Sequence, residues 1–325
     1  MNNFRFWPAA LFLLLAGSLS AQTSSAFYPE EMVVIASSLN LREDADINAP
    51  KIANLPRGSV VEFIEAWNGG ELIELDSLTW GSWYKVRYEG KTGYAFSTYL
   101  TNTFSLFFEN TYMEEVPPML WYGVYARDSF SDELRSINVK VQDQFNEMFG
   151  EYIKVLKTNQ KQESKFIIGT LTPLKTGFVG QLGLFDPKNL FFTSALQPGT
   201  QVSIYPGNEP NDTITRPTWG LAATGCATLD KAYVMVKDYR LTLIDYSTDP
   251  VQTQDLTPWV RPEISDANPS VDLLWFGDLD QDGAPDAILQ DCPYEVGCRA
   301  SLFLSSKAQP GEYIRKVSEY FWPDH

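Results

Sequence analysis

Short runs in which apolar and polar residues alternate dominate the chain, and such runs are typical of β-strands. Between Met32 and Leu100 these runs are separated by Gly, Asn and Asp, a pattern that predicts a small β-barrel. Beyond Pro117 and Pro118, strands are expected at 165–170, 177–184, 202–205, 219–226 and 232–245. A last block predicts strands at 271–276, 287–290, 301–305 and 313–320. The pattern therefore predicts a mainly β protein.

One segment has a different period. Its apolar residues recur at steps of three and four, which predicts one amphipathic helix packed against a sheet. These residues are Val141, Phe145, Met148, Phe149, Tyr152, Ile153 and Leu156. The segment 247–270 is rich in Pro, Asp and Thr and is expected to be an irregular connection. We expect a barrel at 32–100 and a β-rich region at 119–325, and a division of the latter into 119–246 and 271–325 stays open.

The first 21 residues have the pattern of a secretory signal peptide. Arg5 precedes an almost wholly apolar run from Pro8 to Leu19, and the segment ends in small residues at Ala21. The apolar run is shorter than the roughly 20 residues that a membrane-spanning helix needs. We therefore predict cleavage near Ala21 and a secreted or periplasmic protein that is not inserted in a membrane.

Charge and histidine content exclude several function classes. The formal net charge is −16, which argues against nucleic acid or an anionic membrane as partner, because both require basic patches. The only histidine is His325 at the chain terminus, where a side chain is usually too mobile to act as a preorganised base. This excludes Ser-His-Asp and Cys-His nucleophile systems and zinc sites with histidine ligands.

Three cysteines leave one pair and one odd thiol. Cys292 and Cys298 enclose the turn-rich stretch Pro-Tyr-Glu-Val-Gly, and we predict a disulfide between them. Cys226 lies in the apolar run TWGLAATGCATL and is predicted to be a buried free thiol.

Three motifs follow one another in the barrel region. They are Leu39-Asn40-Leu41-Arg42, then Gly58-Ser59-Val60-Val61, then a predicted hairpin from Trp83 to Tyr94 that closes on Tyr99-Leu100. In this order they resemble the bacterial SH3 domain, and the resemblance covers 32–100. It implies a small barrel that binds peptide or cell-wall glycan, often attached to cysteine or zinc peptidases, which the absence of an internal histidine excludes here. The chain departs from the family at Glu43-Asp44-Ala45-Asp46, where Gly-Pro is usual, and by an insertion at 68–81.

Aromatic residues are the candidate ligand contacts of this module, because their rings suit peptide and sugar recognition. The candidates are Trp67, Trp80, Tyr94 and Tyr99. The alternative for Tyr94, as for Trp83, is a place in the core of the barrel.

The stretch FGDLDQDGAPD puts oxygen ligands at alternate positions, as a calcium loop does. The predicted ligands are Asp278, Asp280, Asp282, the Ala284 carbonyl and Asp286. Gly283 permits the sharp turn, but Leu289 stands where an EF-hand has a glutamate, and the flanks are predicted strands. The stretch resembles the DxDxDGxxD calcium loops of FG-GAP and integrin-like β-propeller repeats, although its single copy argues against a whole propeller. We expect a structural calcium ion, and the alternative is an exposed acidic turn without metal.

These features favour a secreted, non-catalytic binding protein of the cell envelope. Its SH3-like module would recognise a cell-wall peptide or glycan, or an envelope protein, and calcium would stabilise the C-terminal region. Two alternatives stay open. One is a histidine-free glycoside hydrolase that uses two carboxylates, for which the adjacent acids Glu114-Glu115 and Asp132-Glu133 are the nearest candidates. The other is a calcium-dependent surface adhesion factor.

Overall fold

The computed structural model describes residues 29–76, 79–127, 131–146, 150–180, 184–185, 195–204, 217–230, 233–260, 271–292 and 297–322. The predicted signal segment 1–21 lies outside these residues. The mainly β prediction is confirmed, and the helical segments described are the short 3-10 turns η1 (Trp67–Gly70), η2 (Ser97–Tyr99) and η3 (Ser305–Lys307). In the described parts of the chain, no helix combines the length and the apolar character needed to cross a membrane.

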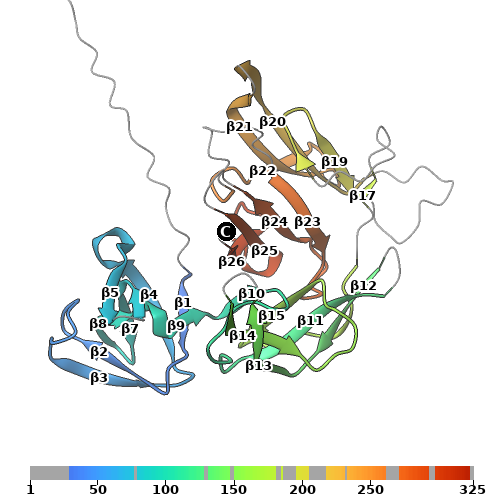
Figure 1. Ribbon diagram of the computed structural model, residues 1–325. Helices are drawn as coiled ribbons and strands as arrows, with labels where there is room; N and C mark the ends of the chain where they lie inside the picture. The colour runs from blue at the N-terminus through green and yellow to red at the C-terminus, as the bar shows by residue number, and fades with distance from the viewer. Residues whose placement is uncertain are drawn as a thin grey trace, which may run out of the picture.

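The N-terminal module is a seven-stranded antiparallel sheet that closes around its own core (Figure 1). The strand order is β3 (Lys51–Pro56), β2 (Ser38–Arg42), β8 (Lys91–Phe96), β7 (Trp83–Tyr88), β4 (Val60–Ala66), β1 (Glu31–Val34) and β9 (Leu100–Asn102). The predicted insertion forms η1 and a hairpin of β5 (Ile73–Asp76) and β6 (Thr79–Gly81).

Local sequence explains how this module closes. In β7 the side chain of Val86 is fully buried while that of Arg87 is exposed, as the alternation predicts. Gly90 adopts a φ of 77° in the turn to β8, a conformation that costs glycine little. A Cβ at Gly93 would lie 2.5 Å from the Arg42 carbonyl oxygen. Glycine at this position therefore lets β8 pass close to β2.

Three five-stranded sheets and the two-stranded hairpin of β13 (Val139–Asn146) and β14 (Glu151–Thr158) form the sheets of the rest of the described chain. The β11 sheet has the order β10 (Phe104–Phe107), β15 (Phe166–Thr170), β11 (Leu120–Ala126), β12 (Asp132–Ser136) and β16 (Gly177–Phe178). The β21 sheet has the order β17 (Leu184–Phe185), β19 (Gln201–Ile204), β20 (Trp219–Asp230), β21 (Tyr233–Asp245) and β22 (Gln252–Asp255). The β24 sheet has the order β18 (Ala195–Leu196), β23 (Val271–Gly277), β24 (Asp286–Asp291), β25 (Cys298–Leu304) and β26 (Arg315–Trp322).

The β24 sheet is covered on both faces (Figure 1). Along β24, Ala287 and Leu289 pack into the core shared with the β21 sheet, whereas Ile288 packs into the core shared with the β11 sheet. All three side chains are at most 1% exposed. Burial of both faces explains why β24 is apolar at consecutive positions and not only at alternate ones. Because β18 belongs to this sheet, the sheets do not follow the division between 119–246 and 271–325.

The predicted helix is wrong. Its segment forms the antiparallel hairpin of β13 (Val139–Asn146) and β14 (Glu151–Thr158), in which Val141 pairs with Leu156 and Phe145 with Tyr152. A step of four residues returns to the same face of a strand as well as of a helix, because strand faces repeat every two residues. Met148 and Phe149 of the predicted stripe lie outside the described residues.

The predicted burial of Cys226 is also wrong, because this free thiol is exposed. β20 extends past the residues that pair with β19, which end at Ala222, and Cys226 lies on that extension. The core between the β21 and β24 sheets includes Leu221 and Ala223 of β20. The apolar run that contains Cys226 therefore continues past the part of β20 that is buried in this core. Cys226 lies on the part beyond it and is exposed.

Candidate functional site

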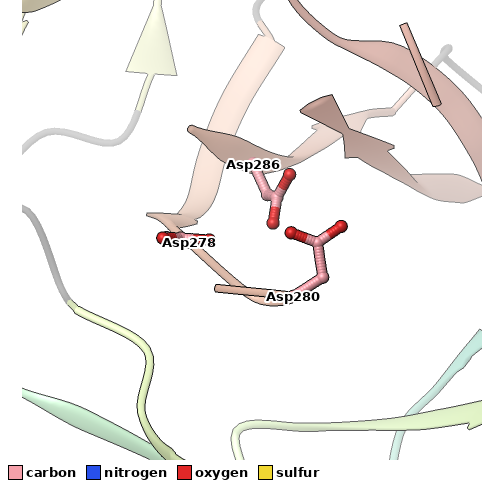
Figure 2. A group of neighbouring side chains, drawn as sticks. All are labelled: Asp278, Asp280 and Asp286. Atoms are coloured by element: carbon pink, nitrogen blue, oxygen red, sulfur yellow. The ribbon is translucent and has the colours of Figure 1, made fainter. Parts of the chain in front are cut away.

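The acidic loop joins β23 to β24 and brings three carboxylates together (Figure 2). One oxygen atom from each of Asp278, Asp280 and Asp286 lies within 4.8 Å of the others. Asp278 follows the last residue of β23, and Asp286 is the first residue of β24 and is fully buried. The structure thus gathers positions 1, 3 and 9 of the predicted ligand set.

Backbone amides hold these carboxylates in place. The two carboxylate oxygens of Asp278 accept hydrogen bonds from the amides of Asp282 and Gly283, each at 3.0 Å. Asp286 Oδ2 accepts a hydrogen bond of 2.6 Å from the amide of Leu279. Gly283 has a φ of 90°, as expected for the residue at the sharp turn. The loop is therefore folded tightly enough to place its acids face to face.

Asp282 accepts hydrogen bonds from the loop and from η3, and its place in the ligand set stays a prediction. Its side chain is exposed, and its Oδ1 accepts hydrogen bonds from the Ala284 amide at 2.8 Å and from Ser305 Oγ at 3.1 Å. It does not belong to the three-carboxylate group found among the described residues. The Ala284 carbonyl as a fifth ligand stays a prediction.

Two serines that the sequence analysis missed support the acidic group from η3. The amide of Ser305 donates to Asp286 Oδ1 at 2.8 Å, and its hydroxyl donates to the same oxygen at 3.0 Å. The hydroxyl of Ser306 donates to Asp280 Oδ2. The only signal for them was a pair of hydroxyl residues directly after the buried strand β25, which does not reveal a partner about 20 positions earlier in the chain.

Burial opposes ionisation at this group. Burial raises the pKa of Asp286 to about 8, and the neighbouring charge of Asp280 acts in the same direction. Burial also raises the pKa of Asp278 and of Asp280. Oδ1 of Asp280 is buried and accepts no hydrogen bond from the described residues. An orphaned oxygen beside two other carboxylates fits a hard cation, whose charge offsets the repulsion and which prefers oxygen ligands.

The acidic loop also contacts the β11 sheet. The amide of Asp278 donates to the Val179 carbonyl at 2.8 Å, and the side-chain amide of Gln281 donates to the Lys175 carbonyl at 2.8 Å. A Cβ at Gly277 would lie 2.3 Å from the Gly180 carbonyl oxygen. The loop therefore fixes the end of β23 against the segment that contains β16.

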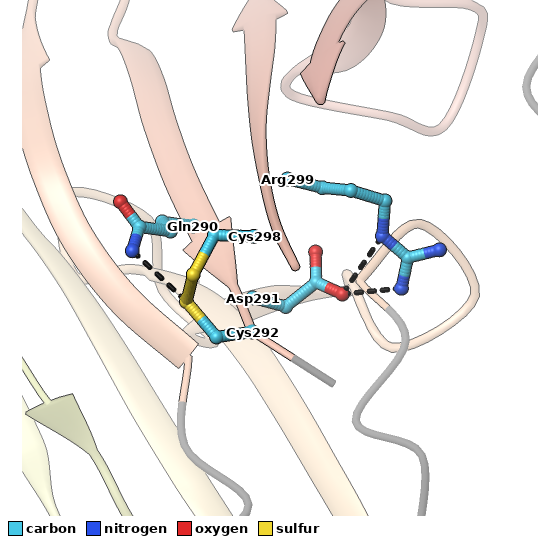
Figure 3. Close-up of a disulfide and its surroundings, with 5 residues drawn as sticks. All are labelled: Gln290, Asp291, Cys292, Cys298 and Arg299. Atoms are coloured by element: carbon cyan, nitrogen blue, oxygen red, sulfur yellow. Dashed lines mark hydrogen bonds and ion pairs between the residues drawn. A yellow bond between two sulfur atoms is a disulfide. The ribbon is translucent and has the colours of Figure 1, made fainter. Parts of the chain in front are cut away.

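The predicted disulfide is present at the other end of β24. The sulfur atoms of Cys292 and Cys298 lie 2.09 Å apart (Figure 3). Directly beside it, Asp291 and Arg299 form an ion pair of 2.5 Å in which both side chains are largely buried. The acidic loop and the disulfide thus hold opposite ends of the same strand.

The aromatic candidates of the N-terminal module differ in exposure. Trp67 in η1 is 38% exposed, whereas Trp83 is 3% exposed and belongs to the core of the module. Tyr94 in β8 and Tyr99 in η2 are partly buried, and Tyr99 packs against that core. Trp80 lies in β6, but its side chain is outside the described residues.

Comparison with known families decides what this module is. Residues 37–101 match the family model of the bacterial SH3 domain. They form a bacterial SH3 domain. Such domains commonly bind cell-wall components, so the SH3 domain gives this chain a general binding role. Neither the curated proteins nor the solved structures contain a match to the chain.

Proposed function

We propose that the protein is a non-catalytic binding protein of the cell envelope and that its SH3 domain recognises a cell-wall peptide or glycan. The observation that carries this proposal is the match of residues 37–101 to the bacterial SH3 domain. Trp67 supports it, because a large ring that is 38% exposed offers a contact surface. Its neighbour Leu72 is 67% exposed and adds apolar surface in the same insertion.

Co-sedimentation with purified peptidoglycan sacculi tests the proposal. The wild-type protein is expected to co-sediment, and Trp67→Ala is expected to bind roughly tenfold more weakly, which corresponds to about 1.4 kcal/mol. Tyr152→Ala is the matched control, because Tyr152 is a 74% exposed aromatic outside the SH3 domain. A protein that stays entirely in the supernatant would remove the cell-wall proposal, and equal losses in both variants would remove Trp67 from the site.

The contacts of the four acids considered for hydrolysis support a non-catalytic role. Each acid lies within 3.1 Å of a basic nitrogen, in the pairs Glu114–Lys154, Glu115–Arg57, Asp132–Lys165 and Glu133–Arg135. Hydrogen bonds from Tyr112 and Lys154 lower the pKa of Glu114, whereas a general acid requires a raised pKa. Release of reducing sugar ends from sacculi during the incubation would contradict the non-catalytic role.

We further propose that calcium binds Asp278, Asp280 and Asp286 and stabilises the β24 sheet. An all-oxygen group at the junction of two strands supports calcium over softer metals. Calorimetric titration should detect one calcium site, and titration with magnesium should give a much weaker signal. A protein that binds neither ion would contradict this part of the proposal.

Secretion is the last part of the proposal, and the pattern of residues 1–21 supports it. Expression of the whole chain in a bacterium should yield a mature protein in the periplasm or medium whose first residue is Gln22. A cytoplasmic protein that retains Met1 would contradict it.

A further inference from the structure

A groove lies at the seam between the β11 sheet and the β24 sheet. One wall is the loop Phe108–Thr111, which follows β10, and the other consists of Leu274, Gln290 and Tyr320. Gln290 and Tyr320 both pair with Ala300, so Gln290, Ala300 and Tyr320 lie on one face of the β24 sheet. Ala300 belongs to the core shared with the β11 sheet. The groove therefore lies where the core between the β11 sheet and the β24 sheet reaches the protein surface.

Apolar surface forms much of the groove. The rings of Phe108 and Tyr320 lie with centroids 5.4 Å apart and planes inclined at 58°. Leu274 is 41% exposed. It is the extra residue of a bulge in β23, between Leu273 and Trp275. Bulges re-aim side chains, and this one directs a leucine out of the core and into the lining of the groove.

Two primary amides supply polar groups beside this surface. Asn110 has a φ of 67°, which is uncommon for a residue other than glycine, and its Oδ1 accepts a hydrogen bond from Lys157 Nζ. Gln290 Nε2 donates to Cys292 Sγ at 3.0 Å (Figure 3). Sulfur is a weak acceptor, so an oxygen atom of a ligand can replace it at little cost. Each amide carries both donors and an acceptor, as a hydroxyl-rich ligand requires.

The wall Phe108–Thr111 is fixed by contacts within the protein. Glu109 Oε1 accepts hydrogen bonds from the Ser164 amide at 3.2 Å, the Ser164 hydroxyl at 3.1 Å and the Thr158 hydroxyl at 3.2 Å. The Asn110 amide donates to the Leu156 carbonyl at 3.0 Å. A wall that is already ordered loses little conformational freedom when a ligand binds.

Charge restricts the class of ligand. Among the residues described as lining the groove there is no lysine or arginine, and the carboxylate of the one acid, Glu109, is turned toward Ser164 and Thr158. The nearest basic group described, Lys157 Nζ, is held by Asn110 Oδ1, so an anion would compete with that bond, and a cation would compete with the bonds that already occupy Glu109. A neutral pyranose has an apolar face of C–H groups and a rim of hydroxyls, and both match the lining. We propose that this groove binds a neutral saccharide and is a second binding site, separate from the SH3 domain.

NMR titration of the whole protein tests the proposal, because the side-chain amides of Asn110 and Gln290 give their own signals. The probes are the neutral tetrasaccharides chitotetraose, cellotetraose and maltotetraose, with tetragalacturonate as the anionic comparison. At least one neutral probe should shift both amide signals at millimolar concentration or below. Absence of any shift with all three neutral probes, or stronger binding of tetragalacturonate, would overturn the proposal.

A double variant tests the same residues independently. Asn110→Gly retains the freedom to adopt a positive φ while it removes the amide, and Gln290→Leu removes the second amide at similar size. The double variant should bind the neutral probe at least tenfold more weakly. Gln142→Leu, on the exposed side of β13, is the matched control and should bind as the wild type does. If the double variant binds as tightly as the wild type, the groove is not the site; if it fails to fold, the titration of the wild type decides.

Discussion

Replacement of Asp280 by asparagine should change stability in opposite directions with and without calcium. Without the cation, three carboxyl groups with oxygens within 4.8 Å of one another repel where they are ionised, which for Asp286 means above its pKa of about 8. For one pair at this distance, the repulsion is about 3 kcal/mol at an effective dielectric constant near 20, and partial exposure of Asp280 reduces it to about 1 kcal/mol. Asp280→Asn should therefore be more stable than the wild type in a chelator, with a melting temperature roughly 2–4 °C higher.

With calcium the order should reverse. A ligand that binds only the native state stabilises the wild type by about 2.7 kcal/mol at a concentration one hundred times its dissociation constant. For a domain of this size that corresponds to a rise of roughly 5–10 °C in melting temperature. In the wild type, Asp280 Oδ1 accepts no hydrogen bond from the described residues and is free to bind the cation. Asp280→Asn lacks this charged ligand, so calcium should raise its melting temperature by a few degrees at most.

Thermal unfolding followed by circular dichroism, in chelator, in calcium and in magnesium, measures both effects. Asp282→Asn is the matched control, because Asp282 is exposed and lies outside the three-carboxylate group. It should retain most of the response to calcium. A wild type that does not respond to calcium, or an Asp280→Asn variant that responds equally, would refute the reasoning. Loss of the response in Asp282→Asn would show that the predicted five-position loop is right and the smaller group is wrong.

Three further predictions concern the packing around this region. Gly277→Ala should destabilise the protein by about 1–3 kcal/mol in urea unfolding, since the new Cβ would lie 2.3 Å from the Gly180 carbonyl oxygen; an unchanged midpoint would contradict the close contact. Burial raises the pKa of Tyr239, whose hydroxyl donates to the Leu196 carbonyl, so its contribution to stability is complete below the unfolded pKa of about 10 and is lost as pH rises above that value. Tyr239→Phe should therefore lose less stability than the wild type between roughly pH 9 and pH 12, where the tyrosine of the unfolded chain ionises while the buried one stays protonated, and parallel curves would contradict this role. Replacement of Cys292 and Cys298 by serine should cost about 2 kcal/mol, the loop-closure term for so short a loop, whereas Cys226→Ser, at an exposed thiol, should cost almost nothing.

The barrel was predictable because its signals are local. Alternation in β7, the glycine turn at Gly90 and the order of the three motifs are each contained in a few adjacent residues. The hairpin β13–β14 was not predictable in the same way. Val141 and Phe145 lie four residues apart, a step that a strand and a helix share, and the pairing partners Leu156 and Tyr152 lie on a second strand. Only the tertiary context distinguishes the two structures.

The acidic loop shows the same limit. Its strands, its turn at Gly283 and its acids could be predicted, because they lie within one short stretch. The hydrogen bonds from Ser305 and Ser306 could not, since they depend on how β25 returns past the loop. These bonds occupy one oxygen of Asp286 and one of Asp280, and the Ser305 hydroxyl also contacts Asp282. The support that η3 gives to these acids follows from that return.

The position of the β24 sheet between two others also constrains the order in which the chain can fold during synthesis. The SH3 domain and its core are complete at β9, so this part can fold while the rest is being made. The β11 sheet and the β21 sheet are both synthesised before β23, yet each buries its inner face against the strands from β23 to β26. Until those strands emerge from the ribosome, two nascent sheets expose apolar faces to the solvent, and a chaperone that covers such surfaces would act during this interval.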